Sequence, residues 1–326
     1  MTFDEGRGSP PLHPITVAIL AEAAAVPRLD PATTPLAAQR RAVEMAAAVW
    51  NDPPFPIARV ETLAVPTPWG AMRARLHVPS EGAADTAILH VHGGGWTFGS
   101  VDTHDGLTRR LAAATRRPVL SIDYRLAPEH PFPAPVEDAA AGLAFLEGGG
   151  IGAPIAASRI VVAGDSAGAQ TVLALLLARR DAGLPPVAAG LLFYGCLAPD
   201  FDTASQRAFG ADERFLLSTE RMRWYWTNHL GDRIDDPGAA APLRADLRGL
   251  PPLFLDAASH DPLRDDTLRL AERLAAIGAP HRLRVTPGVV HGYLRFAARL
   301  PLAMETLEAA AAHLDEATAD AAARAV

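Results

Sequence analysis

The stretch GDSAG at residues 164–168 places a serine between two glycines, directly after the apolar run IVVA. It fits the pattern G-x-S-x-G, in which a strained turn from a strand into a helix exposes a serine hydroxyl at the carboxyl end of a sheet. Gly164 and Gly168 fit this turn because strand and helix approach each other too closely there for Cβ atoms. The pentapeptide alone is weak evidence, and it is the expected strand–turn–helix context that makes Ser166 our candidate nucleophile.

A serine hydroxyl is a poor nucleophile near neutral pH and needs an adjacent base, which an acid must orient. Where such a turn carries the serine, the acid and then the histidine follow along the chain, in loops after later strands. Asp261 is our candidate acid because it lies in the loop after the expected strand PPLFLDAAS. His291 is our candidate base because it follows the last expected strand and precedes a glycine.

Other titratable residues compete for the same two roles. Asp256 is expected within the strand end, whereas Asp265 and Asp266 are expected to begin the next helix, where acidic side chains favour the N-terminus. His260 is the main alternative to His291, and placement in the loop favours His291. Most histidines are structural, so the choice of His291 depends on the agreement of its position, its order in the chain and its flanking glycine.

Three consecutive glycines at 93–95 follow the expected strand AILHVH. A phosphate cradle, a plain loop or a row of N–H groups facing a reacting atom could each use them. The phosphate loop G-x-G-x-x-G would need a glycine where Phe98 stands, and no Gly-Lys-Ser/Thr follows. In folds with the serine turn, this loop donates N–H groups to the oxyanion, together with the residue after the nucleophile, which is Ala167. The run therefore indicates an oxyanion hole.

The elements expected around these residues form an α/β fold. Residues 14–50 carry apolar residues at helical spacing, broken by PRLDPATTP, and residues 58–79 indicate two strands joined by a turn. Short strands rich in Val, Ile and Leu then alternate with helices, interrupted once, as far as a final helix at about 301–317. This alternation predicts a mostly parallel sheet of about eight strands with helices on both faces.

The interruption lies between Pro199 and Gly249 and is rich in aromatic residues. An aromatic insertion late in an α/β sheet is typical of a lid or a pocket wall, although ordinary packing is an equal alternative for each side chain. The candidate pocket residues are Trp96, Tyr194, Phe209, Phe215 and Trp224.

Composition excludes several classes of protein. The 326 residues carry a net charge of −7 with no strong block of one sign, which argues against a nucleic acid partner. The single cysteine, Cys196, excludes an intramolecular disulfide and a cysteine-based zinc site, and it suits a reducing compartment. The acidic N-terminus does not match a signal peptide, and the apolar stretches are far shorter than the roughly 20 residues of a membrane span. We expect a cytoplasmic protein without a membrane span.

Together, the motifs resemble the hormone-sensitive-lipase-like branch of the α/β-hydrolases, the bacterial family IV carboxylesterases. Five segments carry the resemblance, in the same order as in that family: HGGGW at 92–96, DYRLAPEHPFPAPVED at 123–138, GDSAG at 164–168, DPLRDD at 261–266 and HGY at 291–293. The resemblance implies an α/β-hydrolase fold with Ser166, Asp261 and His291 as the triad.

The resemblance also implies that Gly94 and Gly95 act with Ala167 as oxyanion donors, which leaves Gly93 mainly to let the chain turn. It implies a catalytic domain over 51–326 and a helical cap made of residues 1–50 and an insertion at 199–245. Two positions that bear on the size of the acyl pocket differ from the family, namely Ala169, where a further glycine is common, and Cys196, where a proline is common.

The predicted function is that of a serine carboxylesterase that hydrolyses a small-molecule ester, with short acyl chains implied by the cap and with no metal or organic cofactor. The same triad serves amides, lactones and sugar O-acetyl groups, and the sequence does not separate these substrates. A non-catalytic ligand receptor is a third hypothesis; the plant gibberellin receptors resemble this family but lack the catalytic histidine, so His291 argues against it. A homodimer is possible, and the sequence leaves it open.

Overall fold

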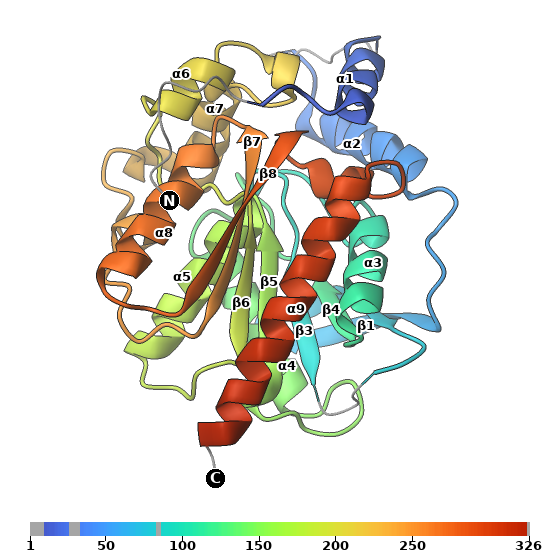
Figure 1. Cartoon of the computed structure of the whole chain (residues 1–326), viewed down its shortest axis with the longest axis vertical. Coiled ribbons are helices and arrows are strands. Elements are labelled where there is room, and N and C mark those ends of the chain that lie inside the picture. The colour runs from blue at the N-terminus through green and yellow to red at the C-terminus, as the bar shows by residue number, and fades with distance from the viewer. Residues whose placement is uncertain (1–9, 26–32, 83–85, 325–326) are drawn as a thin grey trace.

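Short apolar runs form the buried central strands of an eight-stranded sheet, in the order β1-β2-β4-β3-β5-β6-β7-β8 (Figure 1). The computed structural model describes residues 10–25, 33–82 and 86–324, so most of the predicted break PRLDPATTP lies outside the described residues. The six strands from β3 onward are parallel to one another. Their bounds are β3 Ala87–Val91, β4 Val119–Ile122, β5 Ile160–Asp165, β6 Ala189–Phe193, β7 Leu253–His260 and β8 His281–Val290.

A hairpin completes one edge of the sheet. Strands β1 (Arg59–Thr67) and β2 (Gly70–Val78) are antiparallel, and β2 is also antiparallel to β4. The turn between them holds only Pro68 and Trp69, and it lies within residues 58–79, where two strands joined by a turn were predicted. The predicted mostly parallel sheet of about eight strands is therefore confirmed.

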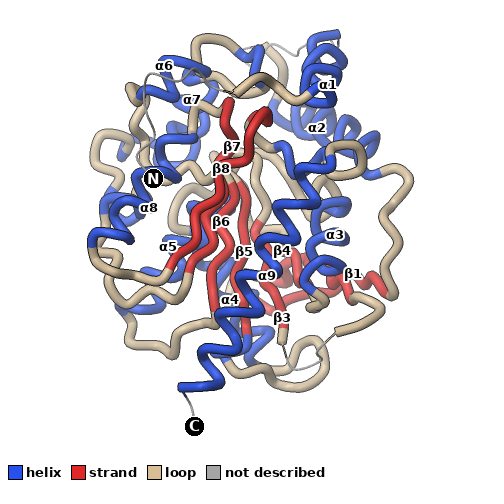
Figure 2. The backbone as a smooth tube through the Cα atoms, viewed as in Figure 1, coloured by secondary structure: helices blue, strands red, loops and turns tan. Residues whose placement is uncertain are grey.

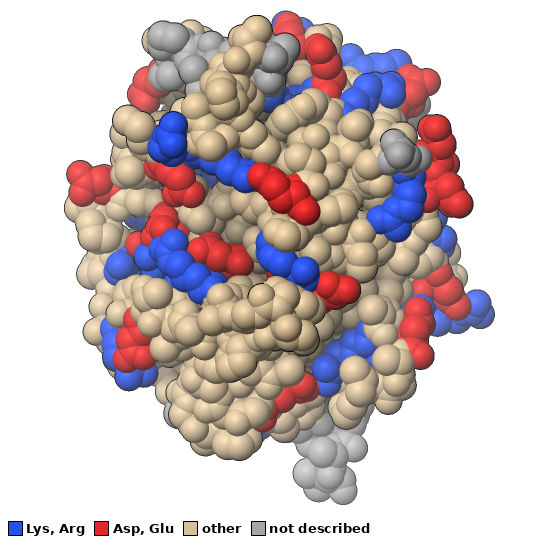
Figure 3. Space-filling model, turned by 180° about the vertical axis from the view of Figure 1, so that it is seen from behind, with Lys and Arg blue, Asp and Glu red and all other residues tan. Residues whose placement is uncertain are grey.

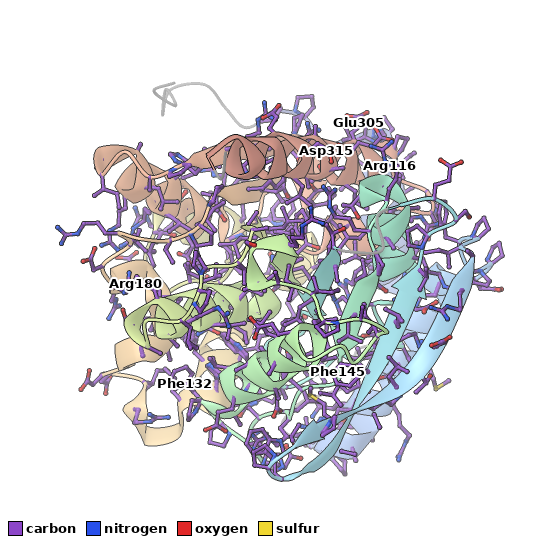
Figure 4. The ribbon with its side chains drawn as sticks, turned by 90° about the horizontal axis from the view of Figure 1, so that it is seen from below. Arg116, Phe132, Phe145, Arg180, Glu305 and Asp315 are labelled. Carbon is purple, nitrogen blue, oxygen red and sulfur yellow. The ribbon has the colours of Figure 1, made fainter. Side chains whose placement is uncertain are left out.

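Helices cover both faces of the sheet (Figure 2). Helices α3 (Asp105–Thr115) and α9 (Pro301–Arg324) pack on one face, and α9 runs past the predicted end at 317. Helices α4 (Ala134–Glu147), α5 (Ala167–Asp181) and α8 (Arg264–Ala276) pack on the other face. Seen from the amino end of the parallel strands, α9 and α4 lie on opposite sides of the sheet (Figure 4).

Four helices gather beyond the carboxyl ends of the central strands, at the top of Figure 1. They are α1 (Pro14–Ala25), α2 (Leu36–Asn51), α6 (Ala204–Phe209) and α7 (Thr219–Leu230). The first two come from the N-terminal segment and the last two from the aromatic insertion, so segments far apart in sequence meet at this end. Short 3-10 turns complete the description: Ala157–Arg159, Glu213–Phe215, Gly231–Arg233, Gly238–Ala240, Pro242–Arg244 and Tyr293–Phe296.

Charges of both signs are interspersed over the face seen in Figure 3, without a large patch of one sign. None of the helices in the described ranges is long and apolar enough to cross a membrane. Nor do three or more His, Cys, Asp or Glu side chains gather into a metal-binding group anywhere in the described part of the chain.

Asp266 lies in the first turn of α8, as predicted, and its side chain is buried. Its Oδ2 accepts hydrogen bonds from the N–H groups of Leu197 (2.7 Å) and Ala198 (3.4 Å). Burial is the largest influence on this carboxyl, and it raises the pKa to about 7. The folded chain therefore keeps a proton that the unfolded chain loses near its ordinary pKa of about 4, so this group lowers the stability as the pH rises between these values.

Replacing Asp266 by asparagine removes this titration. From about pH 5 to about pH 8, the free energy of unfolding of the wild type should fall. We expect this fall to be larger than that of Asp266→Asn by on the order of 2 kcal/mol. Urea unfolding at the two pH values measures both losses. The control is Asp246→Asn, which changes an exposed carboxylate bound to Arg248 and should leave the pH dependence unchanged. Equal losses in the wild type and Asp266→Asn would contradict the prediction.

Candidate active site

Ser166 lies at the turn between β5 and α5, with backbone angles φ 55° and ψ −118°. A non-glycine residue in such a conformation stores strain on the order of 1–3 kcal/mol, which the surrounding structure must hold. The Ser166 N–H donates to the carbonyl of Phe193 at the end of β6 (2.9 Å). A Cβ on Gly164 would lie 2.4 Å from the Gly168 carbonyl, and a Cβ on Gly168 would lie 2.0 Å from the Val91 carbonyl oxygen. The predicted close approach at both glycines is therefore confirmed.

A chain of hydrogen bonds joins the three residues selected from the sequence. His291 Nε2 lies 2.8 Å from Ser166 Oγ, and His291 Nδ1 lies 2.7 Å from Asp261 Oδ2. Asp261 directly follows β7 and His291 directly follows β8, so both project at the carboxyl end of the sheet. The Asp261 side chain is buried, and its second oxygen accepts the N–H of Leu263 at 2.8 Å.

The geometry of this chain suits proton transfer from the serine. An ionised carboxylate only accepts hydrogen bonds, so the imidazole proton lies on Nδ1, toward Asp261. The lone pair of Nε2 then faces the hydroxyl of Ser166, which is the arrangement of a general base beside a nucleophile. The side chain of His291 keeps an exposed fraction of 12%, so a small substrate can reach the pair.

The competing titratable residues lie elsewhere. Asp256 is in the middle of β7, where it accepts hydrogen bonds from the hydroxyls of Thr286 (2.8 Å) and Tyr293 (2.9 Å). Burial is the largest influence on Asp256 and raises its pKa to about 6. His260 is the last residue of β7, and its ring packs against Phe209 with ring centres 5.3 Å apart. Neither side chain is hydrogen-bonded to the serine, so neither takes part in the chain of contacts.

The glycine loop after β3 presents free donors next to the serine turn. Gly94 has φ 117° and Gly95 has φ 61°, a region that residues with side chains rarely adopt. Among the described residues, no hydrogen bond uses the N–H of Gly94 or Gly95. The N–H of Ala167, the first residue of α5, has no partner within the helix, as is general for a helix start. Three backbone donors are thus available around the serine turn.

Gly93 differs from its predicted role as a turn residue, because its φ is not positive. Its N–H donates to Oδ1 of Asp165 at 3.0 Å. A Cβ on Gly93 would lie 2.6 Å from Oδ2 of the same carboxylate. A glycine is needed here because the carboxylate approaches closely, a reason that the predicted role in a turn did not include.

Asp165 is a buried carboxylate that the sequence reasoning overlooked. Nε2 of His90 and Nε2 of His104 lie 3.6 Å and 3.5 Å from its Oδ1. Burial alone would raise the pKa of Asp165, but the charge and hydrogen bonds of His104 and His90 hold that pKa well below its usual range. Asp165 directly precedes Ser166, so its hydrogen bond to Gly93 connects the glycine loop to the serine turn. The signal available in the sequence was an acidic residue adjacent to the candidate nucleophile.

Two of the predicted pocket aromatics lie beside the hydrogen-bonded chain or under the glycine loop. Tyr194 contacts His291 edge to face, with ring centres 5.2 Å apart, and it has φ 38°. Trp96 is fully buried, stacks on His229 at 3.9 Å and donates from Nε1 to Gln170 (3.0 Å). Trp96 therefore anchors the glycine loop to α7 through packing.

The other three predicted aromatics lie in the insertion. Phe209 and Phe215 contact each other with ring centres 5.5 Å apart, and both pack against His260. Trp224 of α7 stacks on Phe98, with ring centres 5.9 Å apart. These contacts attach the insertion to the carboxyl ends of the strands at two separate places.

Tyr225 also packs against the glycine loop, and nothing in its local sequence distinguishes it from the adjacent aromatic residues. A Cβ on Gly95 would lie 2.2 Å from its Cδ1 and 2.3 Å from its Cγ, so the ring covers that peptide directly. Helix α7 thereby packs a ring against the loop that carries two of the free N–H groups.

The two departures from the family pattern are buried in the core. The Cβ of Ala169 would lie 3.1 Å from a Cβ placed on Gly195, which brings helix α5 close to the segment after β6. Cys196 packs in one cluster with Trp96 and Ala167. Burial raises the pKa of the Cys196 thiol well above its usual range, so this side chain acts as a small apolar group rather than as a thiolate.

The fold, the serine turn and the hydrogen-bonded chain define the class of α/β-hydrolases. A family model described as the alpha/beta hydrolase fold matches residues 88–295. The chain therefore belongs to the α/β-hydrolase family and, within it, to the hormone-sensitive-lipase-like carboxylesterases, as the resemblance predicted.

Relatives and solved structures support the same assignment. The chain is 39% identical over 264 residues to the esterase LipI of Mycobacterium tuberculosis, covering 78% of this chain and 81% of LipI. The structure of a hyperthermophilic esterase from Pyrobaculum calidifontis superimposes with a TM-score of 0.87 at 33% identity, covering 94% of this chain and 98% of that chain. An esterase of the bacterial hormone-sensitive lipase family superimposes with a TM-score of 0.77 at 30% identity, over 93% and 97% of the two chains. The chain is thus a carboxylic ester hydrolase.

Proposed function

We propose that the chain hydrolyses small-molecule esters through an acyl-enzyme formed on Ser166. His291 takes the proton of the serine hydroxyl as Oγ attacks the ester carbonyl, and Asp261 holds the imidazole in the correct tautomer. His291 then protonates the leaving alcohol, and water cleaves the acyl-enzyme by the same route. The observation that carries this proposal is the continuous chain Ser166–His291–Asp261, with contacts of 2.8 Å and 2.7 Å.

The oxyanion formed by this attack would be stabilised by backbone donors. The free N–H groups of Gly94 and Gly95, together with that of Ala167, are the groups for this role. Each such donor can contribute about 2.7–4 kcal/mol to transition-state stabilisation. The buried carboxylate of Asp165 acts as a positioning group, because it binds the N–H of Gly93 and so fixes the loop.

We further propose that the N-terminal helices and the insertion form a cap over the site, with residues 1–50 and 199–245 as its two segments and 51–326 as the catalytic domain. The contact of Tyr225 with Gly95 supports this assignment, because it places α7 of the insertion directly over the glycine loop. A wall so close to the oxyanion donors leaves little room for a long acyl chain. The preferred substrates are therefore esters with short acyl groups.

Burst kinetics with 4-nitrophenyl acetate test the proposal. A first turnover that releases nitrophenol faster than later turnovers, with the acetyl group recovered on the peptide that carries Ser166, is the expected result. A series of nitrophenyl esters of increasing acyl length measures the pocket, with kcat/KM expected to fall beyond short chains. Acetylation of another residue, or turnover without any acyl-enzyme after rapid quenching, would overturn the mechanism. A matched anilide separates ester from amide hydrolysis by its kcat/KM.

A further inference from the structure

Arg295 lies in the 3-10 turn Tyr293–Phe296, which Gly292 separates from His291, and it is half-buried. The chain passes through Gly292 with φ 72°, which bends the turn back toward His291. A Cβ placed on Gly292 would lie 3.0 Å from Nη2 of Arg295 and 3.3 Å from its Nε. The guanidinium thus folds over the peptide adjacent to the proposed general base.

The guanidinium of Arg295 has no anionic partner among the described residues. None of their carboxylates forms an ion pair with it, and its side chain donates no hydrogen bond to any of them. Its guanidinium carbon lies 5.8 Å from the centre of the Phe296 ring, a contact that uses none of the N–H donors. Arg299, four residues later, is instead held by Glu22 in two contacts of 2.7 Å.

The positive charge of Arg295 acts on both walls of the proposed site. Burial raises the hydroxyl pKa of Tyr194, which contacts His291, and of Tyr225, which covers Gly95. The charge of Arg295 lowers both pKa values, but its effect is smaller than that of burial. The charge is therefore within electrostatic reach of both tyrosine hydroxyls. Such a half-buried site strengthens a charge interaction compared with one in open water.

The geometry points to an ester whose alcohol part carries a carboxylate as the preferred substrate class, with Arg295 as the residue that binds this carboxylate. The leaving alcohol is the part that receives a proton from Nε2 of His291, and Arg295 covers the peptide that follows this histidine. A guanidinium binds a carboxylate through two parallel N–H donors. The inference rests on the proposed function, because it names the class of ester that this reaction would prefer.

Two aryl acetates test this preference, namely 4-acetoxybenzoate, which carries a carboxylate, and methyl 4-acetoxybenzoate, which is neutral. The measured quantity is the ratio of kcat/KM for the acidic ester to kcat/KM for the neutral ester. We expect Arg295→Gln to lower this ratio about tenfold, as is typical of a lost hydrogen bond to a charged group. Arg295→Lys keeps the charge but not the planar pair of N–H donors, so its ratio should lie between those of the wild type and Arg295→Gln. Raising the salt concentration should lower the ratio in the wild type more than in Arg295→Gln.

Arg299→Gln is the matched control, because it removes a charge from the same segment that is already paired with Glu22. It should leave the ratio within about twofold of the wild type, as expected for an exposed ion pair. An equal ratio in the wild type and Arg295→Gln would overturn the inference while hydrolysis of the neutral ester still supports the proposed function. Failure of the wild type to hydrolyse either ester would instead count against the proposed function.

Discussion

Ser166→Ala is expected to lower kcat/KM for 4-nitrophenyl acetate by on the order of 10⁴- to 10⁶-fold while the protein stays folded. The variant keeps the glycine loop, His291 and Asp261, but the atom that attacks the carbonyl is gone. A large loss is expected because residues that act as a unit fail together when one of them is removed. Alanine replaces serine without altering the backbone conformation, so the thermal unfolding temperature should change little.

Steady-state kinetics together with thermal unfolding separate chemistry from folding in this variant. Ser80→Ala, in an exposed loop, is the control and should match the wild type in both measurements. Ser166→Gly should be as inactive as Ser166→Ala but more stable by about 1 kcal/mol, because glycine adopts φ 55° without strain. Retention of more than about one hundredth of the activity in Ser166→Ala would show that another nucleophile carries the reaction, since the triad effect is far larger.

The sequence predicted the parts of this molecule that depend on local pattern. Alternating apolar strands and helices indicate a parallel sheet, and a serine between two glycines indicates the turn that joins β5 to α5. Chain order then selected Asp261 and His291, and the structure brings both to Ser166. The last helix was predicted too short because its sequence from 318 to 324, TADAAAR, contains no large apolar residue at helical spacing.

The features that the sequence reasoning missed depend on contacts between distant segments. Asp165 lies beside Gly93 only because β3 and β5 are neighbours in the sheet, so the need for glycine at 93 could not be read from the loop itself. Tyr225 differs from the adjacent aromatics in no property of its sequence, and only the packing of α7 selects it. Likewise, Arg295 is one of many arginines until the structure shows which of them are paired.

Gly95→Ala is expected to lower kcat by about 10²- to 10³-fold, the usual effect of losing one oxyanion donor. Gly95 has φ 61°, and an added Cβ would lie 2.2 Å from Cδ1 of Tyr225. Either the ring or the peptide must move, and a shift of the peptide turns its N–H away from the oxygen that becomes charged. The value of KM should change less than kcat, because the donor acts mainly in the transition state.

Gly183→Ala is the matched control for backbone strain in this experiment. Gly183 has nearly the same φ of 65°, but an added Cβ would meet no atom within 4 Å, and it lies after α5, at the opposite end of that helix from Ser166. Gly183→Ala should lose stability by about 1–2 kcal/mol from the left-handed conformation, and Gly95→Ala should lose more because of the collision with Tyr225, while only Gly95→Ala should lose activity. The double variant Gly95→Ala/Tyr225→Ala removes the ring, so a partial return of kcat would assign the loss to the collision. Equal kcat values for Gly95→Ala and Gly183→Ala would show that the N–H of Gly95 does not serve the reaction.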